Sequence, residues 1–129
     1  MNSPLAFLLS IAQGIFAGLQ NLGIHPQAAA RYAAIATVMK AYGMEAPRII
    51  SGRRTAAEQR ELKDRYPDRA ASCSWHTAGL ALDLDYMAAG YPMFAELWAA
   101  TGGRDGRKFS KPDIGHVDIP VDGVPKICV

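Results

Sequence analysis

Apolar and polar residues alternate strictly over residues 80–86, LALDLDY, which predicts a short β-strand. One face of this strand would carry leucines and the other would carry carboxylates: Leu80, Leu82 and Leu84 against Ala81, Asp83 and Asp85. The leucine face is expected to pack on the core. The carboxylate face must then line a cleft or meet a positive group, because an unpaired buried carboxylate is costly.

Apolar residues recur at intervals of three and four elsewhere, which predicts helices. Residues 1–24 are expected to form a helix with one apolar stripe, made up of Leu5, Leu8, Leu9, Ala12, Ile15, Phe16, Leu19 and Leu22. The alanine-rich residues 27–43 form a second helix that ends at Gly43. Residues 55–66 form a third, with Thr55 and Glu58 as a capping box, and residues 91–101 a fourth.

The remaining segments are predicted to be short strands and loops. Residues 47–52 and 116–121 are expected to form strands, and residues 123–129 are a candidate for a last one. Residues 67–79 and 103–115 are expected to be loops. This order predicts an α+β domain, residues 25–129, with a small antiparallel sheet and flanking helices, preceded by the helix of residues 1–24.

Residues 1–30 contain no Lys, Arg, Asp or Glu, so this start could be mistaken for a signal peptide or a membrane span. A signal peptide begins with a basic region, which is missing here. Gln13, Gln20 and Asn21 interrupt the apolar run that a span requires. The sequence therefore favours a helix that packs on its own domain or on a neighbouring subunit, and a membrane is not an expected partner.

Composition is that of a soluble globular protein, with 50% hydrophobic and 20% charged residues. The net charge of +2 gives no reason to expect nucleic acid as a partner, although weak attraction to an anionic polymer such as a cell wall stays open. Cys73 and Cys128 form neither a metal-binding CxxC pair nor a disulfide framework. A bridge between them is possible, and nothing in the sequence supports it.

Candidate chemistry lies beside two of the predicted strands. His76 precedes the LALDLDY strand, and Asp113, His116 and Asp118 surround the start of the strand at 116–121. Two histidines and an aspartate make a three-ligand set for Zn²⁺ that leaves a fourth position for water, and a further carboxylate could serve as general base. From spacing alone, the more common alternative is a polar loop histidine with solvent-exposed aspartates, and it stays open.

Three motifs resemble one family of enzymes. The segment SWHTAGLALD at residues 74–83 resembles the SxHxxGxAxD motif of the D-alanyl-D-alanine carboxypeptidase and L-alanyl-D-glutamate endopeptidase family, zinc peptidases that act on bacterial cell-wall peptides. SGRRTAAEQ at residues 51–59 resembles the family's SGYRSxxxQ element, and DIGH at residues 113–116 resembles its step from catalytic acid to metal ligand. The three motifs occur in the family's order.

The resemblance implies a hedgehog/D-Ala-D-Ala-peptidase-like fold with Zn²⁺ held by His76, Asp83 and His116. It makes Asp113 the general base, and then the acid that protonates the leaving amine.

The same resemblance assigns substrate-binding roles. Arg54 would hold a substrate carboxylate or polarise a carbonyl, a task that suits its planar guanidinium. Ser74 would hydrogen-bond the substrate, and Gln59 belongs to the same substrate-binding set. Gly79 would allow a close approach of loop to strand.

The chain also departs from the family pattern. Arg53 stands where SGYR has an aromatic residue, and Val117 and Asp118 replace the usual residues after the last histidine. These changes affect the substrate wall or the surroundings of the ligands. Asp85 has no assigned role; solvent exposure and a contact to His116 are both open. Carboxypeptidases usually have Glu at the position of Asp113, so Asp here is more similar to the phage endolysin branch, which cuts inside the stem peptide.

The expected function is therefore zinc-dependent hydrolysis of peptidoglycan stem peptides, as an endolysin or a virion-associated lysin. It would act at the bacterial cell wall, from a phage particle or after release during lysis. Other subunits could bind through the N-terminal helix. Two alternatives stay open: a D-Ala-D-Ala carboxypeptidase or dipeptidase, and a non-catalytic structural subunit that keeps the fold. The complete metal-binding set favours the enzyme.

Overall fold

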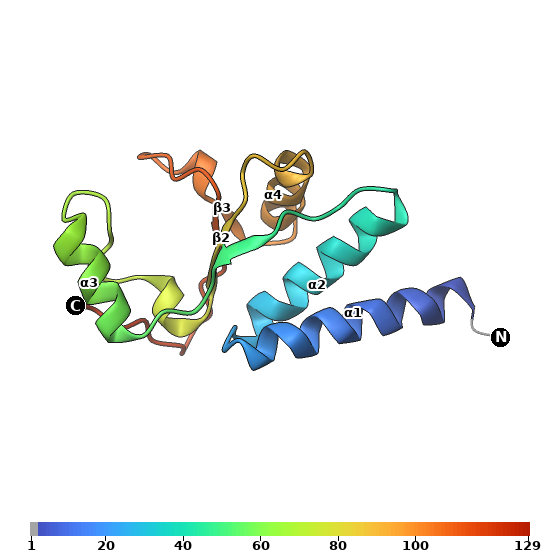
Figure 1. Ribbon diagram of the computed structural model, residues 1–129, viewed down its shortest axis with the longest axis horizontal. Helices are drawn as coiled ribbons and strands as arrows, with labels where there is room; N and C mark the ends of the chain where they lie inside the picture. The colour runs from blue at the N-terminus through green and yellow to red at the C-terminus, as the bar shows by residue number, and fades with distance from the viewer. Residues whose placement is uncertain (1–2) are drawn as a thin grey trace.

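The computed structural model describes residues 3–129 and confirms an α+β arrangement with a small antiparallel sheet and flanking helices (Figure 1). Residues 1 and 2 of the predicted first helix lie outside the described residues. The elements are α1 Pro4–Asn21, α2 Pro26–Ala41, β1 Ile49–Ser51, α3 Ala56–Arg65, β2 Ala81–Leu84, α4 Tyr91–Ala100, β3 Arg104–Asp105 and β4 His116–Asp118, with 3₁₀ turns η1 Trp75–Ala78 and η2 Gly106–Lys108.

The strands lie in the order β1-β2-β4-β3, and every neighbouring pair is antiparallel. The register between β2 and β4 sets Asp83 opposite His116 and Ala81 opposite Asp118. Side chains directly opposite each other on antiparallel strands lie within contact distance. The sheet therefore brings two of the predicted metal ligands together, although they are 33 positions apart in the sequence.

The leucine face of β2 packs on the core, as predicted. Leu80, Leu82 and Leu84 are at most 1% exposed and belong to one cluster with Phe94 and Trp98 of α4. The indole of Trp98 also donates a hydrogen bond to the backbone carbonyl of Asp118, at 2.8 Å. This contact ties α4 to β4.

Helices α1 and α2 pack side by side, joined by a tight turn at residues 22–25 (Figure 1). Gly79, at φ +72°, lies against this turn, and its carbonyl accepts a hydrogen bond from the amide of His25 at 2.9 Å. A Cβ at Gly79 would stand 2.8 Å from the carbonyl oxygen of Gly23. Gly79 was predicted to allow a close approach of loop to strand, and the structure shows its close approach to the α1–α2 turn instead.

Helix α1 is packed most closely on the domain near its C-terminal end. Leu19 is buried, and Ile15 and Phe16 are partly buried against the core. Towards the N-terminus, Leu5 and Phe7 are 67% and 59% exposed. No helix among residues 3–129 is both long and apolar enough to cross a membrane.

Three segments differ from the expectation. Residues 67–79, predicted as loop, contain the turn η1. Residues 103–115, predicted as loop, contain the edge strand β3 and the turn η2. β3 has only two residues and lies between Gly103 and Gly106, so it is too short to show an alternating pattern. Residues 123–129 form no named strand; the contact there is a single bridge between Cys73 and Cys128.

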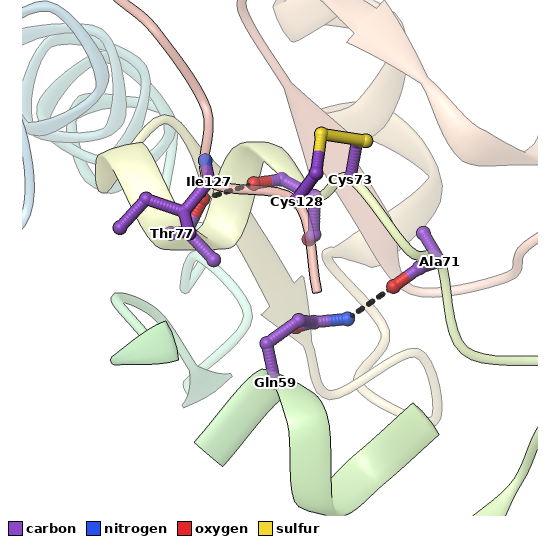
Figure 2. The surroundings of a disulfide bond; sticks show 7 residues. Gln59, Ala71, Cys73, Thr77, Ile127 and Cys128 are labelled. Atoms are coloured by element: carbon purple, nitrogen blue, oxygen red, sulfur yellow. Dashed lines mark hydrogen bonds between the residues drawn. A yellow bond between two sulfur atoms is a disulfide. The ribbon is translucent and has the colours of Figure 1, made fainter. Parts of the chain in front are cut away.

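Cys73 and Cys128 form a disulfide that closes a separation of 55 residues (Figure 2). It fixes the C-terminal tail beside η1. The amide of Ile127 donates to the hydroxyl of Thr77 at 2.8 Å, and the amide of Val129 donates to the carbonyl of Ser72 at 2.8 Å. The tail is therefore held along the loop that leads to His76.

Candidate metal centre

His76, Asp83 and His116 meet at one end of the sheet, and each offers a ligand atom within 4.8 Å of the others. They come from three elements: η1, β2 and β4. His76 is 2% exposed, His116 is 9% exposed, and Asp83 is partly buried. The group could hold a metal ion.

His76 lies in the turn η1, which is capped at both ends, and its ring is held by a hydrogen bond. The Ser74 hydroxyl accepts a hydrogen bond from the amide of His76 at 3.2 Å, and Gly79 ends the turn in the left-handed conformation. Nδ1 of His76 lies 2.7 Å from the carbonyl oxygen of Gly52, to which it donates its proton. Nε2 is then the free nitrogen, and it lies 3.3 Å from Oδ1 of Asp83.

His116 is oriented by a carboxylate that the sequence analysis did not assign. Its Nε2 lies 2.7 Å from Oδ2 of Asp118, so Nδ1 is turned to Asp83, with Oδ1 at 3.4 Å. Asp118 is 1% exposed, and Arg104 donates to both of its carboxylate oxygens, at 2.6 and 2.8 Å. The sequence did contain a signal for this contact. His116 and Asp118 are two positions apart on a predicted strand, so their side chains share one face of it.

Asp85, the other candidate for a contact to His116, serves elsewhere. Its Oδ1 accepts a hydrogen bond from the amide of Met87 at 3.1 Å, which closes the turn after β2. The third histidine, His25, also lies apart from the group: its Nδ1 accepts from the amide of Gln27 and caps α2.

The charges around Asp83 and His116 favour their ionised forms. Burial alone would raise the pKa of Asp83, but hydrogen bonds from His116 and His76 and the charge of Arg54 hold this pKa well below its usual range. Burial alone would lower the pKa of His116, but hydrogen bonds to Asp118 and Asp83 raise it to about 9. Asp83 and Asp118 thus place a carboxylate on each side of the His116 ring.

Arg54 contacts a member of the group directly. Its Nη2 lies 2.6 Å from Oδ2 of Asp83, and its Nη1 donates to the amide oxygen of Gln59 at 3.3 Å. Gln59 is 1% exposed and donates in turn to the carbonyl of Ala71 at 2.8 Å (Figure 2). Gln59 therefore holds Arg54, and Arg54 turns the other oxygen of Asp83 towards the two histidines.

Asp113 lies next to the group and open to solvent. Its side chain is 60% exposed, and Oδ2 stands 3.6 Å from Nδ1 of His116. The amide of Asp113 donates to the carbonyl of Gly106 at 2.8 Å, which fixes the loop ahead of β4. Asp113, Ser74 and His116 line both of two adjoining cavities, of about 320 and 490 Å³. A carboxylate thus faces the cleft beside the candidate metal-binding group.

The chain matches no model of a known protein family, and no curated protein matches it.

Proposed function

We propose that this protein is a zinc-dependent peptidase that hydrolyses peptide bonds in the stem peptides of bacterial peptidoglycan. The observation that carries the proposal is the set of ligand atoms around Oδ1 of Asp83, with His76 Nε2 at 3.3 Å and His116 Nδ1 at 3.4 Å. Two ligands of one tetrahedral zinc ion lie about 3.3–3.4 Å apart when each is about 2.0–2.1 Å from it. The spacing, the nitrogen-rich donor set and the three motifs all support zinc.

The residues around the ligands support the same metal. Ligating histidines usually donate their second ring nitrogen to a carbonyl or a carboxylate, which fixes the ring and makes the ligand more basic. Gly52 supplies the carbonyl for His76, and Asp118 supplies the carboxylate for His116. When bound, zinc would polarise the carbonyl of the scissile bond and make water a stronger acid.

The chain's own side chains provide the proton transfers. Asp113 is exposed to the cleft and stands close enough to the ligand group to take a proton from the attacking water. The same carboxyl group then gives that proton to the amine of the leaving peptide. Asp83 remains ionised throughout, because Arg54 and the histidines stabilise its charge.

The disulfide supports action outside the cytoplasm. Disulfides form and persist in oxidising environments and are rare among cytosolic proteins. The Cys73–Cys128 bond lies next to the loop that carries Ser74 and His76. A cell-wall substrate is consistent with such an environment.

Digestion of purified peptidoglycan, followed by mass analysis of the fragments, tests the proposal. We expect release of peptide fragments that stops with a chelator and returns with zinc. Fragments cut within the stem peptide would identify an endopeptidase, and loss of a single terminal D-alanine would identify a carboxypeptidase. An intact wall after treatment with the zinc-loaded protein would contradict a peptidase function and favour the structural-subunit alternative.

A further inference from the structure

The larger of the two cavities extends away from the metal-binding group and is rich in cations. It has a volume of about 490 Å³ and shares Ser74, Asp113 and His116 with the smaller one. Four basic side chains line it: Arg69, Arg104, Lys111 and Lys126. The two carboxylates of its lining are Asp113 and Asp118, so cations outnumber carboxylates.

Three of these cations are available to a ligand. Arg104 is held by both oxygens of Asp118. Lys111 donates only to the backbone carbonyl of Asp68 at 2.9 Å, and the ammonium of Lys126 lies 4.8 Å from the ring centre of Trp75. Among the ion pairs of residues 3–129, none involves Arg69, Lys111 or Lys126.

These three cations reach the cavity from separate segments. Arg69 follows α3, Lys111 precedes β4, and Lys126 lies in the C-terminal tail. The tail is fixed two residues later by Cys128, whose disulfide to Cys73 holds it beside η1 (Figure 2). A covalent bond thus keeps one of the cations at the rim of the cleft.

Arg54 cannot serve as the free cation of the site in this arrangement. Its guanidinium already holds Asp83 and Gln59, and its side chain is only 17% exposed. An anionic group of a substrate would therefore meet Arg69, Lys111 and Lys126 instead. Arg69 lines both cavities, and Lys111 and Lys126 line the larger one.

We propose that this cavity binds a carboxylate of the peptide substrate, so that the enzyme selects peptides with a free carboxylate near the bond to be cut. The proposal rests on the peptidase function proposed above. A peptide fits better than an extended polyanion, because the net charge of the chain is only +2 and the free cations gather in one cavity beside the ligands. The aromatic rings of Trp75 and Phe109 would pack on the aliphatic parts of the peptide.

The test compares two synthetic stem peptides that differ only in one carboxylate, free in the first and amidated in the second. The parent protein is compared with the double variant Lys111→Gln/Lys126→Gln. Lys40→Gln/Arg60→Gln is the matched control, since it removes the same charge from two exposed positions that line neither cavity. We expect the parent and the control to prefer the acid peptide about tenfold in kcat/KM, and the ratio in the double variant to fall to about one.

A second readout separates this proposal from the peptidase function. Calorimetry measures binding of both peptides to the zinc-loaded parent and double variant, without requiring turnover. A binding preference for the acid peptide that disappears in the double variant supports the carboxylate site even if neither peptide is cut. Equal affinity for the two peptides, or cleavage with the same acid-to-amide ratio in parent and double variant, would overturn the site and leave the peptidase function standing. Binding of a phosphate polymer without a preference for the acid peptide would also overturn it.

Discussion

Oδ2 of Asp118 lies 2.7 Å from Nε2 of His116, on the opposite side of the ring from the nitrogen that faces Asp83. The same carboxylate is held by Arg104 and is 1% exposed. Burial would raise the pKa of Asp118, but the hydrogen bonds from His116 and Arg104 lower it. Asp118 is therefore a charged partner that orients the candidate ligand His116 from the side of the ring opposite Asp83.

Asp118→Asn should weaken zinc binding on the order of 10-fold, at the lower end of the range for a partner of a ligating histidine. The amide keeps the size of the side chain but loses the charge that makes His116 a better ligand. Competition with a fluorescent chelator measures the affinity. Asp122→Asn, at an exposed position, is the control. Equal affinity in Asp118→Asn and the parent would show that Asp118 acts on the fold alone.

His76→Ala should abolish stoichiometric zinc binding, because it removes one of three ligand atoms from a buried group. Elemental analysis of the purified protein measures the zinc content. The matched control is His25→Asn, which changes a histidine outside the group and keeps a residue able to cap α2. Unchanged zinc content in His76→Ala would rule out the assigned site.

Local patterns in the sequence correctly predicted the buried face of β2 and the start of α3. The leucines of β2 face the core, and Thr55 with Glu58 forms the capping box of α3. Both features depend on residues within a few positions of each other, so period and spacing identify them. The ligand set came from the motifs, since no local rule reveals that β2 pairs with β4 and sets Asp83 opposite His116.

The features that were missed depend on contacts between distant segments. The Cys73–Cys128 bond joins residues 55 positions apart, and the Arg104–Asp118 pair joins β3 to β4. Nothing near Arg104 in the sequence marks it as the partner of a buried carboxylate. Likewise, the motif placed Gln59 near the substrate, and only the fold brings Ala71 and Arg54 to the two ends of its amide.

Asp113→Asn should keep zinc and stability but lower turnover on the order of 10²–10⁴-fold, the usual effect of removing a positioned proton-transfer group. The side chain is exposed, so its replacement leaves the core unchanged. Rates of release of wall peptides, measured with zinc content on the same samples, test this. Asp64→Asn, an exposed aspartate of α3, is the control. A variant that digests cell wall at the parental rate would exclude Asp113 as the base.

The double variant Cys73→Ser/Cys128→Ser should lose about 4 kcal/mol of unfolding free energy, because the disulfide closes a loop of 55 residues in the unfolded chain. Urea denaturation of the variant and of the parent, with and without reductant, measures the loss. Neither cysteine belongs to the proposed ligand group, so zinc binding should persist under native conditions. A parent protein whose unfolding midpoint does not respond to reductant would contradict a structural role for the bond.

The last prediction concerns α1, whose two halves differ in packing. Leu19 is 8% exposed and belongs to the core cluster, whereas Leu9 is 54% exposed. Leu19→Ala should therefore destabilise the fold by about 2–5 kcal/mol, and Leu9→Ala should change its stability by less than about 0.5 kcal/mol. Urea denaturation compares the two variants, which make the same chemical change on one helix and serve as each other's control. Sedimentation of the same samples reports whether Leu9 contributes to an interface, since loss of an exposed apolar side chain weakens association without affecting the isolated fold. A large loss of stability in Leu9→Ala, dependent on protein concentration, would mean that the N-terminal half of α1 is covered by another subunit.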